Sequence, residues 1–147
     1  MCIRDSYFIT VCTKDRKPIL AVPDIADLLR QEWQAASKRH GWLIGRYVIM
    51  PDHVHFFCTE QSAGSKRSLA GFMNKWKEWT SKEICAASGA AAPVWQPEFF
   101  DHALRNDESY AEKWLYVREN PVRAGLAATW KEWPYMGFVD FDSPLGS

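Results

Sequence analysis

The chain lacks the features that mark several common protein classes. Its four cysteines form no close pair and no C-x-x-C motif, which suits a reducing compartment. No apolar run reaches the length of a membrane span, and the N-terminus lacks the apolar core of a signal peptide. Lysine plus arginine and aspartate plus glutamate both number 18, so overall charge argues neither for nor against nucleic acid. We therefore expect a cytoplasmic protein without membrane contact.

Length and composition indicate one folded domain. The 147 residues are 47% apolar and 14% aromatic, which is enough for a core. We expect a single domain over 1–147, with irregular structure at 1–6 and 137–147. Charge is segregated, because residues 66–82 carry a net charge of +4 and residues 98–119 a net charge of −3.

Periodicity and turn residues predict the order β-α-β-β-α-β followed by another helix. Strands are predicted over 7–12, 42–50 and 53–59 and, after a bend, within 95–105; helices are predicted over 24–40, 68–85 and from 106 to 120. Asp24 and Ser68 are expected to cap the first two helices, Gly41 to end the first, and Pro121 to stop the third. This order is typical of a ferredoxin-like, RRM-like α+β sandwich, in which two helices pack on an antiparallel sheet.

Two histidines with one valine between them follow the turn at Pro51-Asp52. Successive side chains of a strand point to opposite faces, so His53 and His55 share a face. Two imidazoles on one rigid strand can hold a metal ion. Taken alone, such a pair is more often a pair of buried or cross-strand histidines.

A second candidate pair lies in the third predicted helix. Tyr116 and Asn120 are four residues apart and are expected one turn from each other on one side of the helix. Asn120 offers a carbonyl oxygen that can complete a metal site, and Tyr116 would then lie beside the metal as a nucleophile. A tyrosine at this spacing, taken alone, is also typical of packing.

Several segments resemble one protein family. Tyr47-Val-Ile-Met-Pro-Asp-His-Val-His resembles the histidine–hydrophobic–histidine segment of the single-tyrosine HUH transposases. Tyr116-Val-Arg-Glu-Asn-Pro-Val-Arg-Ala-Gly-Leu is similar to the nucleophile helix of one branch, the REP-associated tyrosine transposases. Trp95-Gln-Pro-Glu-Phe-Phe-Asp-His-Ala-Leu-Arg and Tyr7-Phe-Ile-Thr-Val-Cys-Thr resemble two strands of that branch. The resemblance extends over residues 7–135.

The resemblance implies an enzyme that cleaves and rejoins single-stranded DNA, at hairpin-forming repeats, through a 5′-phosphotyrosine. It makes Tyr116 the nucleophile and His53, His55 and Asn120 the ligands of a divalent metal ion. Mn²⁺ accepts mixed nitrogen and oxygen ligands, whereas Mg²⁺ prefers oxygen ligands. The set contains both kinds of donor, so either ion is compatible with it. Asp52 departs from the family pattern, which more often has Asn there, and the chain after Tyr135 is short.

Weaker candidates for DNA contact are basic. Lys75 and Lys77 on the second predicted helix could follow phosphates, and Lys77 matches a basic position of the family; an ordinary solvated face is the alternative. Arg118 and Arg123 flank the expected site and could hold DNA, or be surface arginines. His102 lies in a familial motif but receives no role. The sequence leaves open whether the enzyme is a monomer or a homodimer, and whether Tyr116 acts in its own subunit.

Two other function classes account for fewer of these residues. A non-catalytic nucleic-acid-binding module on a ferredoxin-like sheet has no reason to combine these histidines with Tyr116 and Asn120, and the aromatic signature of RNA-recognition domains is missing. A histidine phosphoesterase would need a third alternating histidine, where this chain has Phe57, or a second His-x-Thr/Ser motif. The transposase interpretation accounts for more of the residues.

Overall fold

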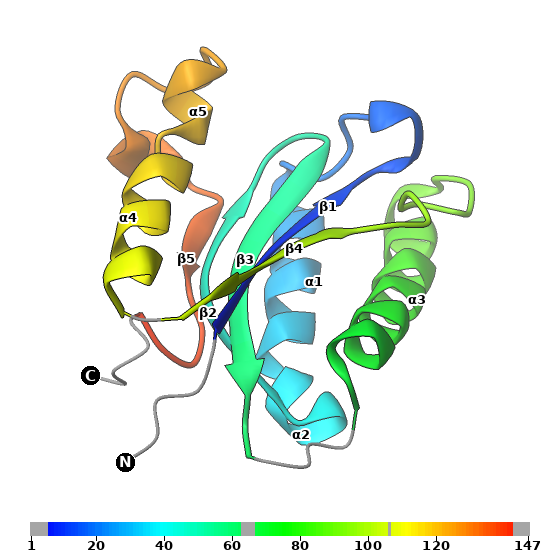
Figure 1. Ribbon diagram of the computed structural model, residues 1–147. Helices are drawn as coiled ribbons and strands as arrows, with labels where there is room; N and C mark the ends of the chain where they lie inside the picture. The colour runs from blue at the N-terminus through cyan, green and yellow to red at the C-terminus, as the bar shows by residue number, and fades with distance from the viewer. Residues whose placement is uncertain (1–5, 63–66, 106, 143–147) are drawn as a thin grey trace.

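The computed structural model, which describes residues 6–62, 67–105 and 107–142, has a five-stranded antiparallel sheet in the order β4-β1-β3-β2-β5 (Figure 1). The first four strands have the arrangement of a ferredoxin-like fold, so the predicted α+β sandwich is confirmed. The strands are β1 (Ser6–Cys12), β2 (Trp42–Ile49), β3 (His53–Glu60), β4 (Phe100–Leu104) and β5 (Met136–Phe138). The helices are α1 (Pro23–Gln34), α2 (Ala36–His40), α3 (Leu69–Ser88), α4 (Asp107–Val117) and α5 (Asn120–Arg123), with 3₁₀ turns η1 (Lys14–Arg16) and η2 (Trp130–Glu132).

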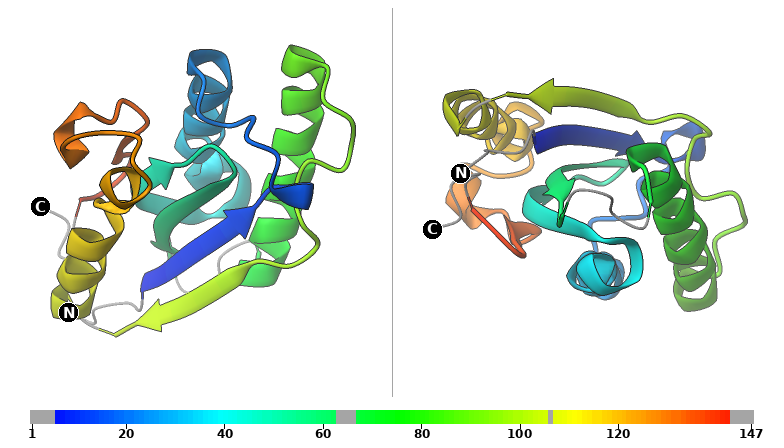
Figure 2. Two further views of the ribbon diagram at one scale, coloured as in Figure 1. Left: turned by 90° about the horizontal axis from the view of Figure 1, so that it is seen from above. Right: turned by 60° about the horizontal axis from the view of Figure 1, so that its bottom comes forward.

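Helices cover both faces of the sheet (Figure 2). Each face has its own apolar cluster. On one face α1 and α3 pack through Trp33 and Trp76 against Phe56 of β3. On the other face α4 packs through Tyr110 against Phe57, the next residue of β3. Because β3 is the central strand, its alternating side chains reach both clusters. None of the described helices is long and apolar enough to cross a bilayer.

The first helix differs from its prediction at both ends. Its N-cap is Val22 rather than Asp24, which lies in the first turn near the positive end of the helix dipole. The predicted helix 24–40 is two helices, broken at Ala35, and Gly41 in the left-handed conformation ends the second. The cap at Ser68 is confirmed, since its hydroxyl accepts a hydrogen bond from the Gly71 amide at 3.1 Å.

The C-terminal region differs from its prediction in one helix and one strand. The helix that was expected to continue to Pro121 ends at Val117, and α5 begins at Asn120. Pro121 has no amide hydrogen for the Val117 carbonyl, which prevents one continuous helix. Residues 136–138, partly within the segment expected to be irregular, form β5 and pair with Arg46, Tyr47 and Val48 of β2.

Strand β2 contains a β-bulge between Ile44 and Tyr47. Ile44 pairs with Cys58 and Tyr47 pairs with Phe56, so β2 has one extra residue between these pairs. Such a bulge re-aims side chains. Gly45 lies within it, and a Cβ there would be 2.6 Å from the Phe141 ring and 2.8 Å from the Tyr110 hydroxyl. The close packing of α4 and Phe141 therefore requires glycine at this position.

Candidate active site

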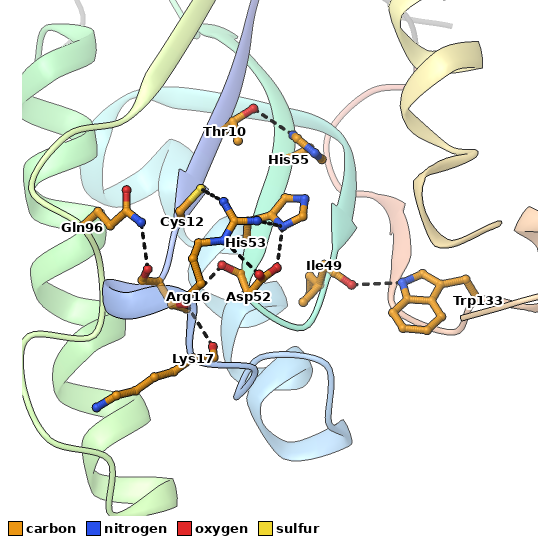
Figure 3. A network of polar contacts seen from close by, with 11 residues as sticks. Thr10, Cys12, Arg16, Lys17, Ile49, Asp52, His53, His55, Gln96 and Trp133 are labelled. Carbon is orange, nitrogen blue, oxygen red and sulfur yellow. Dashed lines mark hydrogen bonds and ion pairs between the residues drawn. The ribbon is translucent and has the colours of Figure 1, made fainter. Parts of the chain in front are cut away.

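His53 and His55 lie side by side on the face of β3 that α4 covers (Figure 3). Val54 between them is fully buried on the opposite face with α1 and α3. The two imidazole centroids are 4.8 Å apart and the ring planes are inclined by 79°. The strand thus holds two imidazoles as neighbours, and both are partly accessible.

Asp52 and Arg16 orient the first imidazole. Oδ1 of Asp52 lies 2.8 Å from Nδ1 of His53, and its Oδ2 accepts from Nε of Arg16 at 2.9 Å (Figure 3). Burial alone would raise the pKa of Asp52, but the hydrogen bonds with His53 and Arg16 outweigh it and hold that pKa below its usual value. Asp15 and Arg16 both have positive φ, an uncommon conformation for residues other than glycine. The turn that carries Arg16 is thus held in an unfavourable conformation beside the histidines.

Thr10 orients the second imidazole from the neighbouring strand. Thr10 and His55 are partners in the β1–β3 register, and the Thr10 hydroxyl lies 2.8 Å from Nδ1 of His55. The ring also stacks on Phe8 at 5.2 Å between centroids. Burial, with smaller contributions from the charges of His53, Lys113 and Arg123, lowers the pKa of His55 to about 3. The ring is therefore neutral at physiological pH, as a metal ligand must be.

The two histidines fit a metal site in their chemistry. A ligating histidine usually engages its second ring nitrogen with a carboxylate, carbonyl or hydroxyl partner, which fixes the ring. Here Nδ1 of both rings is engaged in this way, so Nε2 is the nitrogen suited to a metal ion. Within the described part of the chain, no three or more His, Cys, Asp and Glu side chains form a group that could hold a metal. The family resemblance implies the amide of Asn120 as the third ligand.

Arg123 links Tyr116 and Asn120. Its Nη2 donates to the Tyr116 carbonyl at 2.8 Å and to Oδ1 of Asn120, and its guanidinium carbon lies 4.0 Å from the Tyr116 ring centroid. Tyr116 is on α4 and Asn120 opens α5, so the expectation that one unbroken helix carries both is wrong. The amide oxygen of Asn120 has two lone pairs, and Arg123 occupies one. The helix is interrupted between Tyr116 and Asn120, and Arg123 contacts both residues across this interruption.

The tyrosine side chain is open to solvent. Tyr116 is 64% exposed and borders a hollow of about 300 Å³ between β4 and α4, with His102, Ser109, Glu112 and Lys113 among its lining residues. His102, to which the sequence assigned no role, therefore lies near the candidate nucleophile. Tyr110, the only nearby alternative phenol on α4, is 2% exposed, accepts from the Arg46 amide at 3.1 Å, and has its pKa raised by burial. Of the two, Tyr116 is the phenol that a DNA strand can reach.

Lys113 of α4 and Arg123 of α5 both act electrostatically on His55. Nζ of Lys113 lies 5.0 Å from the ring centroid of Phe8, on which His55 stacks. The charges of Lys113 and Arg123 also contribute, after burial, to the lowered pKa of His55. A phosphate group at the histidine face would be attracted by these cations.

The structure does not bring all predicted DNA contacts together. Arg118 lies with its guanidinium carbon 4.3 Å from the Trp130 centroid, beside α4. Lys75 and Lys77 belong to α3, which covers the opposite face of the sheet. Nζ of Lys77 donates to the carbonyls of Gln96 and Pro97 at 3.0 and 2.6 Å, and burial lowers its pKa.

Sequence reasoning missed Thr10, Arg16 and Lys113, and treated Asp52 as a minor departure in a turn. The position of Asp52 directly before His53 was an available signal. The contacts of Thr10 and Arg16 depend on strand register and on a loop conformation, which local sequence patterns do not specify.

The chain matches one protein family and several relatives of known sequence or structure. The family described as "Transposase IS200 like" matches residues 4–114, which include both histidines and end before Tyr116. A REP-associated tyrosine transposase of Escherichia coli (strain K12) is 27% identical over 133 residues, which is 90% of this chain and 76% of that protein. A solved structure of a REP-associated tyrosine transposase bound to a REP hairpin has a TM-score of 0.73 and 24% identity, covering 92% of this chain and 77% of that one. The family and sequence matches confirm the resemblance to REP-associated tyrosine transposases, and the structural match shows the common fold.

Proposed function

The chain belongs to the IS200-like transposase family, and we propose that it is a metal-dependent enzyme that cleaves and rejoins single-stranded DNA through Tyr116. The observation that carries this proposal is the pair of imidazoles on β3, each held at Nδ1 by a neighbouring side chain, on the sheet face that α4 covers. A module that only binds nucleic acid would not need two histidines oriented in this way.

Tyr116 supplies the nucleophile in the proposed reaction. Its phenolic oxygen loses a proton and attacks the scissile phosphorus, while the bond from phosphorus to the 3′ oxygen breaks and that oxygen gains a proton. The products are a 5′-phosphotyrosine and a free 3′ hydroxyl, which can attack the phosphotyrosine and rejoin a strand. The 64% exposure of Tyr116 supports this role, because the attacked phosphate must approach from solvent.

His53, His55 and Asn120 are the residues that would hold a divalent ion, either Mn²⁺ or Mg²⁺. When bound, such an ion polarises the scissile phosphate and compensates the charge that develops on it. Asp52 and Thr10 keep the two imidazoles in the orientation that this requires. Arg123 orients the Asn120 amide and at the same time contacts the Tyr116 ring and carbonyl.

Lys113, Arg118 and Arg123 are the cations that we propose for the DNA backbone near the cleavage site. Lys113 lies on α4, Arg118 directly follows it, and Arg123 ends α5, so all three are close to Tyr116 in the chain. Lys75 and Lys77 stay proposed phosphate contacts for a part of the DNA that reaches the α3 side of the molecule. Since Lys77 is already held by two carbonyl groups, Lys75 is the freer of the two to move toward a phosphate.

The proposed substrate is single-stranded DNA next to a hairpin, in line with the hairpin bound to the structural relative. The packing of Tyr110 and Trp114 of α4 on the sheet supports an active site within one subunit. A homodimer that exchanges α4 would make these contacts between its two subunits, whereas here a single chain makes them itself.

The proposal is tested by incubating the protein with a panel of single-stranded hairpin oligonucleotides and Mn²⁺, and by mapping cleavage positions on a denaturing gel. We expect cleavage at a fixed position in a flank of one hairpin type, and no cleavage in excess chelator. His55→Ala should retain DNA binding and lose cleavage. Binding without cleavage by the wild-type protein would instead favour a non-catalytic binding domain, and cutting in excess chelator would make the histidines structural.

A further inference from the structure

A second hollow lies next to α4, away from the one that Tyr116 borders. It has a volume of about 330 Å³, and its lining is mainly aromatic and basic: Arg46, Trp114, Trp130, Lys131, Trp133 and Phe138. These residues come from β2, α4, η2 and β5, elements that are distant in sequence. Of the residues that the structure describes around this hollow, none is a carboxylate. The hollow therefore favours an electron-rich ligand with an aromatic or flat apolar face.

Arg46 lies between two aromatic rings. Its guanidinium carbon is 4.9 Å from the Trp114 centroid and 5.4 Å from the Phe138 centroid. The bulge in β2 adds a residue just at this point of the strand. The Nε donor of Arg46 is buried, and it has no hydrogen-bond partner within the described ranges 6–62, 67–105 and 107–142. A buried donor without an acceptor is unfavourable, so a ligand that supplies an acceptor would be stabilised here.

The other walls present aromatic faces and further positive charge. Trp130 has the Arg118 guanidinium 4.3 Å and the Lys131 ammonium 5.8 Å from its centroid. Trp133 is fixed by a hydrogen bond from Nε1 to the Ile49 carbonyl at 3.0 Å. Phe138, in contrast, is 53% exposed although it belongs to β5. An exposed ring at the rim of a basic hollow is suited to stacking with a ligand that comes from solvent.

We propose that this hollow, which we call the Trp130 pocket, binds one unpaired nucleobase of the DNA strand on which Tyr116 acts. Aromatic side chains stack on any base, and arginine donates to acceptors on base edges. The volume is at the lower end of the range for small-ligand pockets, about 300–1,000 Å³, which suits one base rather than a larger group. This inference rests on the proposed function, because it assumes the same single-stranded substrate.

The position of the pocket relative to the nucleophile supports this assignment. Trp114 and Tyr116 are two residues apart in α4, and with 3.6 residues per turn their side chains leave the helix on nearly opposite sides. Trp114 borders the Trp130 pocket, while Tyr116 borders the hollow next to His102. A helix with its side chains is only about 10–12 Å wide. A strand that passes the end of α4 can thus place one phosphate near Tyr116 and an adjacent base in the Trp130 pocket.

The test compares two oligonucleotides that carry the same hairpin and the same phosphates. One has normal nucleotides in its single-stranded flanks, and the other has abasic flanks. Affinities are measured by fluorescence anisotropy for the wild-type protein, Phe138→Ala, Phe138→Leu and Arg46→Met. Leu115→Ala serves as the matched control, since Leu115 is 52% exposed on α4 and does not line the pocket. Thermal melting verifies that each variant folds.

The wild-type protein should bind the normal flanks more tightly than the abasic ones. Phe138→Ala should weaken binding of the normal oligonucleotide by about tenfold, as expected for the loss of one base–aromatic stack, and leave binding of the abasic one unchanged. Phe138→Leu, which keeps packing but has no ring, should show the same loss, as should Arg46→Met. Equal losses on both oligonucleotides, or no loss on either, would overturn the pocket. Formation of the Tyr116 adduct is scored separately, so failure of the pocket and failure of the proposed cleavage are distinguishable.

Discussion

Oδ1 of Asp52 lies 2.8 Å from Nδ1 of His53, while Oδ2 of the same carboxylate accepts from Arg16. The carboxylate thus connects the strained turn at residues 15–16 with the first residue of β3. An imidazole held in this way has little freedom to rotate. The orientation of His53, which we propose as a metal ligand, therefore depends on a residue that the sequence pattern presents only as part of a turn.

Replacing Asp52 should weaken metal binding. Asp52→Ala removes the acceptor for Nδ1 of His53, and loss of such a partner typically costs about 10–100-fold in metal affinity. Asp52→Asn should retain most of the affinity, because its amide oxygen can accept the same hydrogen bond. Isothermal titration with Mn²⁺ measures both. Unchanged affinity in Asp52→Ala would show that the carboxylate does not orient a ligand.

Arg123→Lys should slow cleavage without a comparable loss of DNA binding. Lysine keeps the positive charge, but it lacks the guanidinium that reaches the Tyr116 carbonyl and the Asn120 amide together. Misplacement of reacting groups by about 1 Å can cost about 100-fold in rate, so we expect a decrease of about 10–100-fold. Single-turnover cleavage and anisotropy on one oligonucleotide separate the two effects. Parallel losses of binding and cleavage would reduce Arg123 to a phosphate contact.

The limits of sequence reasoning are visible in particular elements. Strand β3 and the cap at Ser68 could be predicted because alternation and capping are local patterns. The break at Ala35 could not, because the apolar spacing continues across it. Strand β5 has only three residues, too few for a periodic signal, and it forms by pairing with β2.

In the candidate site, too, local patterns predict some features and tertiary structure determines the others. His53, His55, Tyr116 and Asn120 could be proposed as site residues from spacing and motif resemblance. Their connections through Thr10 and Arg123 depend on strand register and on the interruption between α4 and α5. Local patterns contain neither kind of information.

Gly45→Ala should destabilise the fold. The added methyl group would be 2.6 Å from the Phe141 ring and 2.8 Å from the Tyr110 hydroxyl, both of which lie in the cluster beneath α4. Overpacking of this kind costs about 1–3 kcal/mol in the free energy of unfolding. Gly71→Ala is the control, since its methyl would lie 3.3 Å from the Ser68 hydroxyl and 3.5 Å from Cβ of Arg67, and alanine favours helix by up to about 1 kcal/mol. Chemical denaturation of both variants checks the difference, and equal stabilities would contradict the packing account.

Stability should also depend on pH through Glu83. Burial, together with the neighbouring Glu32 carboxyl, raises the pKa of Glu83 to about 7, although Arg39 opposes this. A folded-state pKa above the unfolded value means that Glu83 contributes stability below about pH 4.5 and that this contribution is lost as pH rises to about 7. Glu83→Gln carries no titrating group, so its melting temperature should fall less than that of the wild type between pH 5 and pH 8. Identical pH profiles would contradict the raised pKa.

The covalent intermediate tests the central claim most directly. Single-stranded hairpin DNA, labelled on the 3′ side of the cleavage position, is incubated with Mn²⁺ and either wild-type protein or Tyr116→Phe, and the products are separated on a denaturing gel. Tyr116 is 64% exposed, so loss of its hydroxyl should leave folding and DNA affinity nearly unchanged. We predict a labelled protein–DNA band with the wild type and none with Tyr116→Phe. An adduct of equal yield with Tyr116→Phe would show that another residue is the nucleophile, and cleavage without any adduct would show that water attacks the phosphate.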